Sequence, residues 1–364
     1  MASPEEQARQ RLIQQAQQRQ LQLMAARQQQ QQGQGINQTG QQMGMAMGSS
    51  NTPTGLSMAT PHDDIPITTP SDLDLFTGRA TLHPDFISFQ AACQNGPLSS
   101  VESIITSEPR SPAFLHQGLV IALGAGNIDA AHYLLGNGAP VTRQTPPHVL
   151  SAPKDRQIAL FELLTQHGWT PNTPGFYGAT LLPRVVTDDG LLDWFLSHGA
   201  DPNLAAQRDN RDRFGEPDID SCVTLETAAS RGSVESVRKL LDAGARMENG
   251  SPLYFAAGAR PPNTNPHTLP VRPSKDFDEA RIPIMALLIE KGADVNGKLQ
   301  SRHMTAQYPI VNAVIAGAVE RVRWLLSRGA DPNLRGAYGS AAEYARKAGS
   351  DEMKLVLGID LVET

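Results

Sequence analysis

The chain has 364 residues, of which 40% are hydrophobic and 19% are charged, so it is long enough to bury a sizeable core and is not disordered throughout. Its formal net charge of −6 is uneven, because residues 1–62 carry four arginines and only two glutamates. The mildly acidic remainder lacks the positive surface that sequence-independent binding to nucleic acid or to an acidic membrane requires.

Two cysteines and one short apolar run limit the class of protein further. Cys93 and Cys222 form no CxxC motif, which excludes a disulfide framework and a cysteine zinc site, and we expect both thiols to be buried. The longest apolar run, residues 118–126, is shorter than the roughly 18 residues of a membrane helix. We therefore expect a soluble intracellular protein, cytoplasmic or nuclear.

The first 83 residues have a composition unlike the rest of the chain. Seventeen of the first 42 residues are glutamine, a Met/Gly patch and a Ser/Thr/Pro stretch follow, and the first aromatic residue is Phe76. This composition predicts a disordered Gln-rich tail over 1–83. Residues 12–26 approximate a heptad seam that Arg19 interrupts, so a partner-induced helix or coiled coil is the alternative.

Three threonines of this tail precede proline: Thr52, Thr60 and Thr69. A proline-directed kinase could reach them in an exposed linker, and we expect phosphorylation there to add charge without altering the fold. The alternative is that the prolines only keep the linker extended.

A repeated motif organises the rest of the chain. The sequence LLDAGA at residues 240–245 recurs in five related copies, and a glycine anchors every copy. The anchors are spaced 30 to 48 residues apart, which indicates a period near 33 with insertions. Each follows a leucine-rich helical segment, where a left-handed C-cap favours glycine. The anchor glycines are Gly138, Gly168, Gly199, Gly244, Gly292 and Gly329.

Upstream of each anchor lies a second, shorter helical pattern, and residues 224–245 show the whole unit without gaps. This unit resembles the ankyrin repeat, whose pattern runs T-P-L-H-x-A-A-x-x-G-H, a second helix, and then L-L-x-x-G-A-D. The matching positions are Thr224, Leu225, Ala228, Ala229, Gly232, Val237, Leu240, Leu241, Gly244 and Ala245. The resemblance implies an all-α solenoid of stacked helix-turn-helix units with hairpin loops.

We expect the array to cover residues 84–360 in about seven to eight units. A degenerate first repeat is predicted over 89–108 and a terminal capping repeat over 337–357. In the third unit the first helix is interrupted at Pro153. Insertions are predicted at 204–221, where charges alternate in sign, and at 261–283, which contains six prolines. We expect the second insertion to be disordered.

No motif in the sequence indicates catalysis, a cofactor or a metal. Residues 119–131 imitate a dinucleotide-binding turn, but Asp129 would repel pyrophosphate, and the repeat spacing already explains Gly126. The nine histidines form no HxH, HxxH or HExxH pair. His167 and His198 directly precede anchor glycines, where we expect them to bond the last helical carbonyls.

The resemblance implies a non-catalytic scaffold or adaptor that binds protein partners through its concave face and hairpin tips. We expect a monomer that binds neither nucleic acid directly nor a membrane. One variable position in each first helix points to the concave side, and four such positions are candidate contacts: Ile121, Thr227, Phe255 and Asn312.

Three other functions stay open. A transcriptional co-regulator would use the Gln-rich tail to recruit partners, and a substrate adaptor of a ubiquitin ligase would need a docking motif. An enzyme is the third, although the sequence contains no catalytic constellation. For Phe255 the alternative to partner contact is burial beneath the insertion at 261–283.

Overall fold

The computed structural model describes residues 84–264, 272–301, 305–337 and 339–360, all within one compact unit, Ala59–Thr364. The predicted tail, with Thr52, Thr60 and Thr69, lies outside these residues, as do residues 265–271 of the second insertion. The described part is helical, and its only β-pairings are two isolated bridges. None of its helices combines the length and apolarity needed to cross a membrane.

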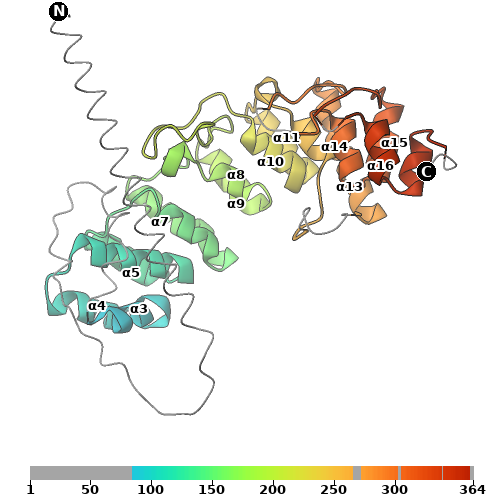
Figure 1. Cartoon of the computed structure of the whole chain (residues 1–364). Coiled ribbons are helices and arrows are strands. Elements are labelled where there is room, and N and C mark those ends of the chain that lie inside the picture. Colours follow the sequence, from blue (N-terminus) through green and yellow to red (C-terminus); the bar gives the residue numbers. More distant parts are fainter. Residues whose placement is uncertain (1–83, 265–271, 302–304, 338, 361–364) are drawn as a thin grey trace, which may run out of the picture. The chain divides into compact units, whose positions relative to one another are not determined.

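Eight helix pairs follow one another through the described residues (Figure 1). The first helices of the pairs form one layer: α3 (Phe86–Asn95), α5 (Pro112–Ala125), η3 (Pro146–Ser151), α8 (Leu182–Val185), α10 (Val223–Arg231), α12 (Pro252–Ala257), α14 (Pro309–Ile315) and α16 (Ala341–Ala348). The second helices form the other: α4 (Leu98–Ser107), α6 (Ile128–Gly136), α7 (Lys154–Gln166), α9 (Asp189–Ser197), α11 (Val234–Asp242), α13 (Lys275–Glu290), α15 (Val319–Ser327) and α17 (Asp351–Val356).

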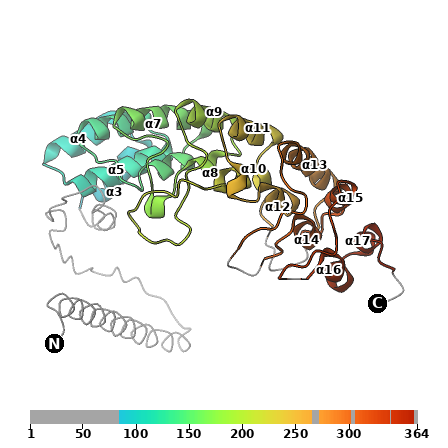
Figure 2. The same ribbon diagram turned by 90° about the horizontal axis from the view of Figure 1, so that it is seen from above.

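Within each layer, most helices pack on their equivalent in the neighbouring pair, as α10 does on α12 and α13 on α15. In Figure 2 the second layer lies along one edge of the array and the first layer along the other. The all-α solenoid of helix-turn-helix units predicted from the sequence is confirmed. Two further short 3-10 helices, η4 (Phe176–Gly178) and η5 (Met247–Asn249), lie in the hairpin loops.

Local sequence explains where many of these helices begin and end. The side chains of Ser111, Asn127, Asp188 and Ser274 each accept a hydrogen bond from a backbone N–H in the first turn of the helix that follows. All six anchor glycines have positive φ angles between 79° and 103°, so the predicted left-handed C-caps are confirmed.

Residues 112–131 form α5 and the start of α6, separated by Gly126 and Asn127, rather than a strand and a phosphate-binding turn. Residues 119–125 belong to α5, and Gly126 ends that helix with a φ of 79°. The imitation of a dinucleotide site is therefore a helix C-cap, as the repeat spacing indicated.

The third pair departs from the others, as the interruption at Pro153 predicted. Its first element is the 3-10 helix η3, and α7 starts directly after Pro153. Ala152, directly before Pro153, has an extended backbone with a ψ of 159°, so the first element stops there.

The second insertion is shorter than the predicted range 261–283. Helix α13 starts at Lys275 and runs through Pro283 to Glu290, so the last nine residues of that range are helical. Asp278 and Ile284 of α13 are both buried, which shows that packing against the array holds the helix together across its internal proline.

The core lies between the two layers and between neighbouring pairs. Its largest aromatic group is formed by Phe161, Trp169, Trp194 and Phe195, in which the contacting rings have centroids 5.1 to 6.0 Å apart. These rings bring α7 and α9 together. His198 follows the last helical residue of α9, and its Nδ1 lies 2.7 Å from the Trp194 carbonyl oxygen, which confirms the predicted capping role.

Candidate partner-binding face

The four predicted contact residues all lie on first-layer helices. Ile121 is on α5, Thr227 on α10, Phe255 on α12 and Asn312 on α14, and each is half-buried. Helices α10, α12 and α14 pack in sequence against one another, whereas η3 and α8 lie between α5 and α10 in the layer. The structure therefore places three of the four residues on neighbouring helices, while Ile121 lies farther along the array.

Two of these side chains already have partners within the chain. The Thr227 hydroxyl donates to the Val223 carbonyl oxygen at 2.7 Å. Asn312 Nδ2 donates to the Tyr254 carbonyl oxygen at 3.0 Å, and a Cβ atom at Gly258 would lie only 1.9 Å from the same Nδ2. Asn312 therefore joins α14 to α12.

The two apolar residues of the set, Ile121 and Phe255, are partly exposed to solvent. Phe255 packs against the core and meets the Tyr254 ring edge-to-face, with centroids 5.3 Å apart. Ile121 is likewise a partly buried residue at the edge of the core. Whether either contacts a partner stays a prediction.

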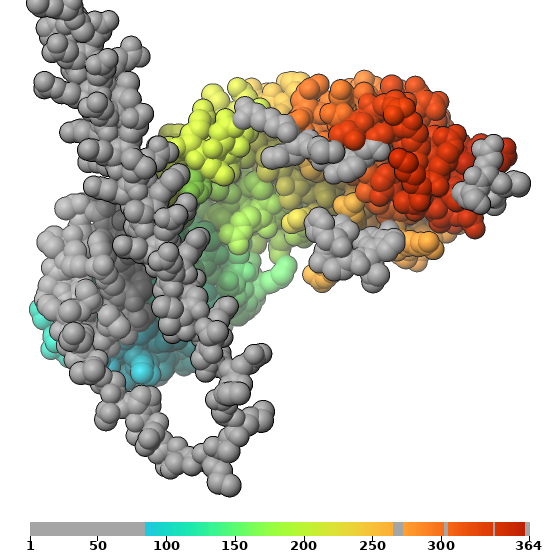
Figure 3. All heavy atoms as spheres, viewed as in Figure 1, coloured from blue at the N-terminus to red at the C-terminus, as the bar shows by residue number. Residues whose placement is uncertain are grey.

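The insertion at 204–221 is an ordered loop. Ala205 and Asp218 exchange two backbone hydrogen bonds, of 3.2 and 3.0 Å, and Gln207 Nε2 donates to the Glu216 carbonyl oxygen at 2.9 Å. Arg211 Nη2 lies 2.7 Å from Asp218 Oδ1. The alternating charges of the sequence are therefore partly paired within the loop, which forms the yellow-green surface in Figure 3.

Rings and arginines meet where this loop contacts the hairpin before α8. The Phe176 and Phe214 rings lie edge-to-face at 5.8 Å, and the Arg213 guanidinium lies 4.1 Å from the Phe176 centroid. Arg143 donates from Nη2 to the Phe214 carbonyl oxygen at 2.6 Å. Tyr177 is held at a φ of 55°.

Part of this ring and arginine cluster faces solvent. Among the large hydrophobic side chains exposed in the described residues, four lie on or beside the loop: Tyr177, Phe214, Ile219 and Val223. The sequence showed the alternating charge of this segment but not its aromatic surface, because Phe176 and Phe214 lie 38 positions apart. Only the docking of the loop brings them together.

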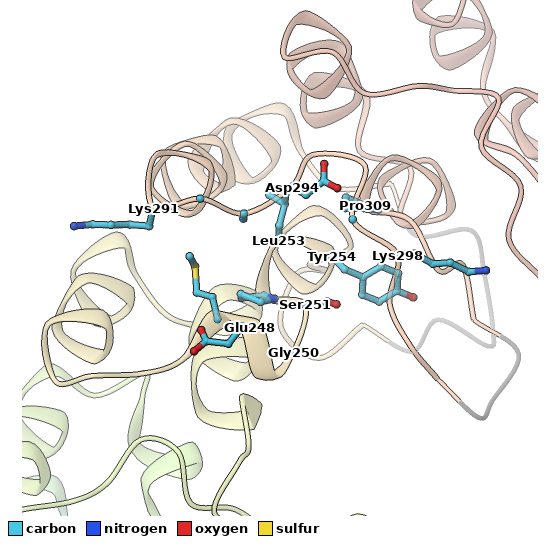
Figure 4. Close-up of a pocket in the computed structure, with 14 residues that line it drawn as sticks. Glu248, Gly250, Ser251, Leu253, Tyr254, Lys291, Asp294, Lys298 and Pro309 are labelled. Atoms are coloured by element: carbon cyan, nitrogen blue, oxygen red, sulfur yellow. The ribbon is translucent and has the colours of Figure 1, made fainter.

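A cavity of about 390 Å³ opens between two neighbouring hairpins (Figure 4). One wall comes from η5 and the start of α12, and the other from residues 291–298 after α13. Its lining carries charges of both signs and one phenol: Glu248, Tyr254, Lys291, Asp294 and Lys298. No sequence motif indicated this cavity.

Buried ionisable groups near the face have structural partners. Burial raises the pKa of Glu226, whose Oε1 accepts a 2.8 Å hydrogen bond from the Ser251 N–H of the next hairpin. Burial also raises the pKa values of Cys93 and Cys222 to about 12, so both thiols are protonated at neutral pH. The predicted burial of both cysteines is confirmed. In the part of the chain that the structure describes, no group of three or more His, Cys, Asp or Glu residues could hold a metal ion.

Comparisons with known proteins give structural neighbours only. No family model and no curated protein sequence matches the chain. The ankyrin repeat domain of Bcl-3, described as a unique member of the IkappaB protein family, is 21% identical, with a TM-score of 0.36 over 66% of this chain and 86% of that chain. The human ASB11 ankyrin repeat domain is 20% identical, with a TM-score of 0.37 over 74% of this chain and 96% of that chain. At these values, the fold assignment depends on the helix pairs, C-caps and hairpins described above.

Proposed function

We propose that this chain, whose described part folds as an ankyrin-repeat solenoid, is a non-catalytic scaffold that binds protein partners through its first-layer helices and hairpin loops. The observation that carries the proposal is the exposed ring and arginine surface formed by Tyr177, Phe214 and Arg213. Aromatic residues and arginine are enriched where protein interfaces concentrate their binding energy, because they provide large contact areas.

The charge of this surface favours a protein over a nucleic acid. The loop 204–221 carries five carboxylates against three arginines, and the whole chain has a formal charge of −6. Such a surface lacks the excess of cations that phosphate backbones attract. We extend the proposal to a monomeric scaffold that binds neither nucleic acid nor membranes directly.

The test is partner capture by the full chain, followed by affinity measurements with the captured partner. We expect Phe214→Ala to weaken binding at least fivefold, which corresponds to about 1 kcal/mol. Leu355→Ala is the matched control, because it removes an exposed apolar side chain from α17, away from the loop. Equal affinities of both variants and the unmodified chain would overturn the role of the loop.

Phe255 tests the first-layer helices. If its ring contacts a partner, Phe255→Ala weakens binding at least fivefold while the melting temperature changes little. Ile158→Ala on the second-layer helix α7 is the control, since Ile158 is also partly exposed. A loss of about 3 kcal/mol or more in unfolding free energy, with unchanged affinity in the folded fraction, would instead show that the ring is a core residue.

The pathway of the scaffold is a separate question from its binding. An adaptor, a transcriptional co-regulator and a substrate adaptor of a ubiquitin ligase would all use the same face. Imaging of the tagged full chain in its native cells distinguishes them in part, because only a co-regulator requires nuclear accumulation.

A further inference from the structure

The fourth residue after an anchor glycine connects neighbouring hairpins. At three of the five junctions between consecutive anchors this residue is asparagine, and its Nδ2 donates to the carbonyl oxygen of the next anchor glycine at 2.8 to 3.1 Å. Its Oδ1 accepts from the N–H two residues beyond that glycine at 2.8 to 2.9 Å. The bridging residues are Asn172, Asn203 and Asn296.

These three bridges define what the receiving backbone recognises. A glycine C=O and an N–H two residues later lie side by side and bind both ends of one carboxamide. A primary carboxamide presents its N–H and its oxygen on the same edge, whereas a trans peptide group directs them to opposite sides. The receiving pair therefore fits an asparagine or glutamine side chain, which supplies the donor and the acceptor on one edge.

The junction between Gly244 and Gly292 lacks this bridge. Its fourth residue is Glu248, whose ionised carboxylate has no hydrogen to donate to the Gly292 carbonyl oxygen. Glu248 lies in η5, and in Figure 4 its carboxylate points away from Asp294. Within the described residues, no hydrogen bond reaches the Gly292 carbonyl oxygen or the Asp294 N–H, and both residues are exposed.

The remaining junction, between Gly138 and Gly168, also lacks asparagine, but one of its two receiving groups is already bonded. Thr142 stands at the fourth position, and the N–H of the receiving Thr170 is bonded by its own neighbour, Thr173 Oγ1, at 2.9 Å. Only the Gly292 junction leaves both receiving groups open among these five, and the 390 Å³ cavity lies beside it.

We propose that the Gly292 carbonyl and the Asp294 N–H bind an asparagine or glutamine side chain from an extended segment of a protein partner. The inference rests on the proposed protein-binding function and names a chemical group that the partner supplies. An ionised acidic side chain has no hydrogen to donate to the Gly292 carbonyl oxygen. A lysine side chain cannot accept from the Asp294 N–H.

The first experiment uses NMR on the ¹⁵N-labelled full chain, titrated with N-acetylasparagine N-methylamide. We expect a saturable shift of the Asp294 amide signal. The matching leucine and aspartate compounds should leave that signal in place, because they lack the primary carboxamide. The amides of Asp201 and Asp331 are internal controls that should not respond, since Asn172 and Asn296 already bond them.

Variants distinguish specific binding at the Gly292 junction from a non-specific response of an exposed amide. Asn296→Ala opens the last junction, so the Asp331 amide should gain the response to the asparagine compound. Glu248→Asn supplies a carboxamide within the chain and should remove the response of Asp294, whereas Glu248→Ala should keep it. An Asp294 signal that stays fixed, or that moves equally with the leucine compound, would overturn the site.

The partner itself tests whether the site is used. We expect Glu248→Asn to weaken binding of the captured partner at least threefold. Glu248→Ala should weaken that binding less. If Glu248→Asn has no effect, a partner carboxamide at this site is refuted. Because the scaffold function is tested separately with Phe214→Ala, the carboxamide site can fail while the proposed function stands.

Discussion

His116 is a neutral residue inside the array. Its side chain is buried, and Nε2 lies 3.0 Å from Thr145 Oγ1 and 3.3 Å from Thr142 Oγ1. Burial, and to a smaller extent the neighbouring His148, lowers the pKa of His116 from 6.5 to about 4. The folded state therefore disfavours the imidazolium form that the unfolded chain adopts readily in mild acid.

This pKa difference makes stability depend on pH. The folded pKa is the lower one, so the contribution of His116 is complete above pH 6.5 and is lost as the pH falls toward 4. The loss reaches up to about 3 kcal/mol. We expect His116→Gln, which does not titrate, to flatten the dependence of unfolding free energy between pH 7 and pH 4.5. Parallel curves for both proteins would contradict the assignment.

Arg321 is a fully buried cation that joins three helices. Its Nε donates to Asp278 Oδ1 at 2.5 Å, and its Nη atoms donate to carbonyl oxygens at the end of α12 at 2.7 to 3.1 Å. Asp278 Oδ2 in turn accepts from the Glu320 N–H in the first turn of α15, at 2.7 Å. The ion pair of Arg321 and Asp278 therefore links the C-terminal end of α12 and the first turn of α15 to α13, which lies between them in the sequence.

Removing either Arg321 or Asp278 leaves the other as a buried charge without its ion-pair partner. We expect Arg321→Ala to lower the unfolding free energy by roughly 3 to 5 kcal/mol in urea titrations. Arg323→Ala is the control, because this neighbouring arginine is half exposed and its ion pair with Glu320 contributes about 1 kcal/mol or less. A double-mutant cycle with Asp278→Ala should show coupling above about 1 kcal/mol, and additive effects would contradict the network.

At the scale of the element, the asparagine bridges fix one hairpin on the next. Asn203 makes two such bonds and is buried, whereas Asn333 occupies the same place in an identical GADPN turn but is exposed. In the described residues, no bond joins the Asn333 side chain to another hairpin. We expect Asn203→Ala to cost about 1 to 2 kcal/mol and Asn333→Ala less than about 0.5 kcal/mol in unfolding free energy. Equal costs would show that the turn, rather than the bridge, needs asparagine.

At the scale of the whole molecule, the described core starts with the first helix pair. Phe86 and Phe89 of α3 pack on Phe114 of α5, and the Phe89 and Phe114 rings stack at 4.3 Å. We expect deletion of residues 1–75 to leave the melting temperature unchanged. Deletion of residues 1–95 should lower it, because α3 is lost and Phe114 becomes exposed. A fall of several degrees with the shorter deletion would show that the tail contributes to the fold.

Much of this architecture could be predicted because it depends on local chemistry. An anchor glycine such as Gly244 is readable in the sequence, since a left-handed C-cap excludes most side chains whatever packs around it. The alternation of alanine-rich and leucine-rich helices likewise follows from how closely each layer packs. This periodicity placed the predicted binding positions on the first layer. It could not show that the Asn312 side chain already donates a hydrogen bond to the Tyr254 carbonyl oxygen.

The sequence by itself determined the repeat, its C-caps, its helix order and the absence of recognisable catalytic motifs, because these depend on neighbours within one unit. Tertiary structure alone decided that α13 continues through Pro283, that the loop 204–221 docks its rings against the preceding hairpin, and that Arg321 is buried. It also decided that the Gly292 junction stays open. Each of these outcomes depends on contacts between residues tens of positions apart, whose energies no local pattern encodes.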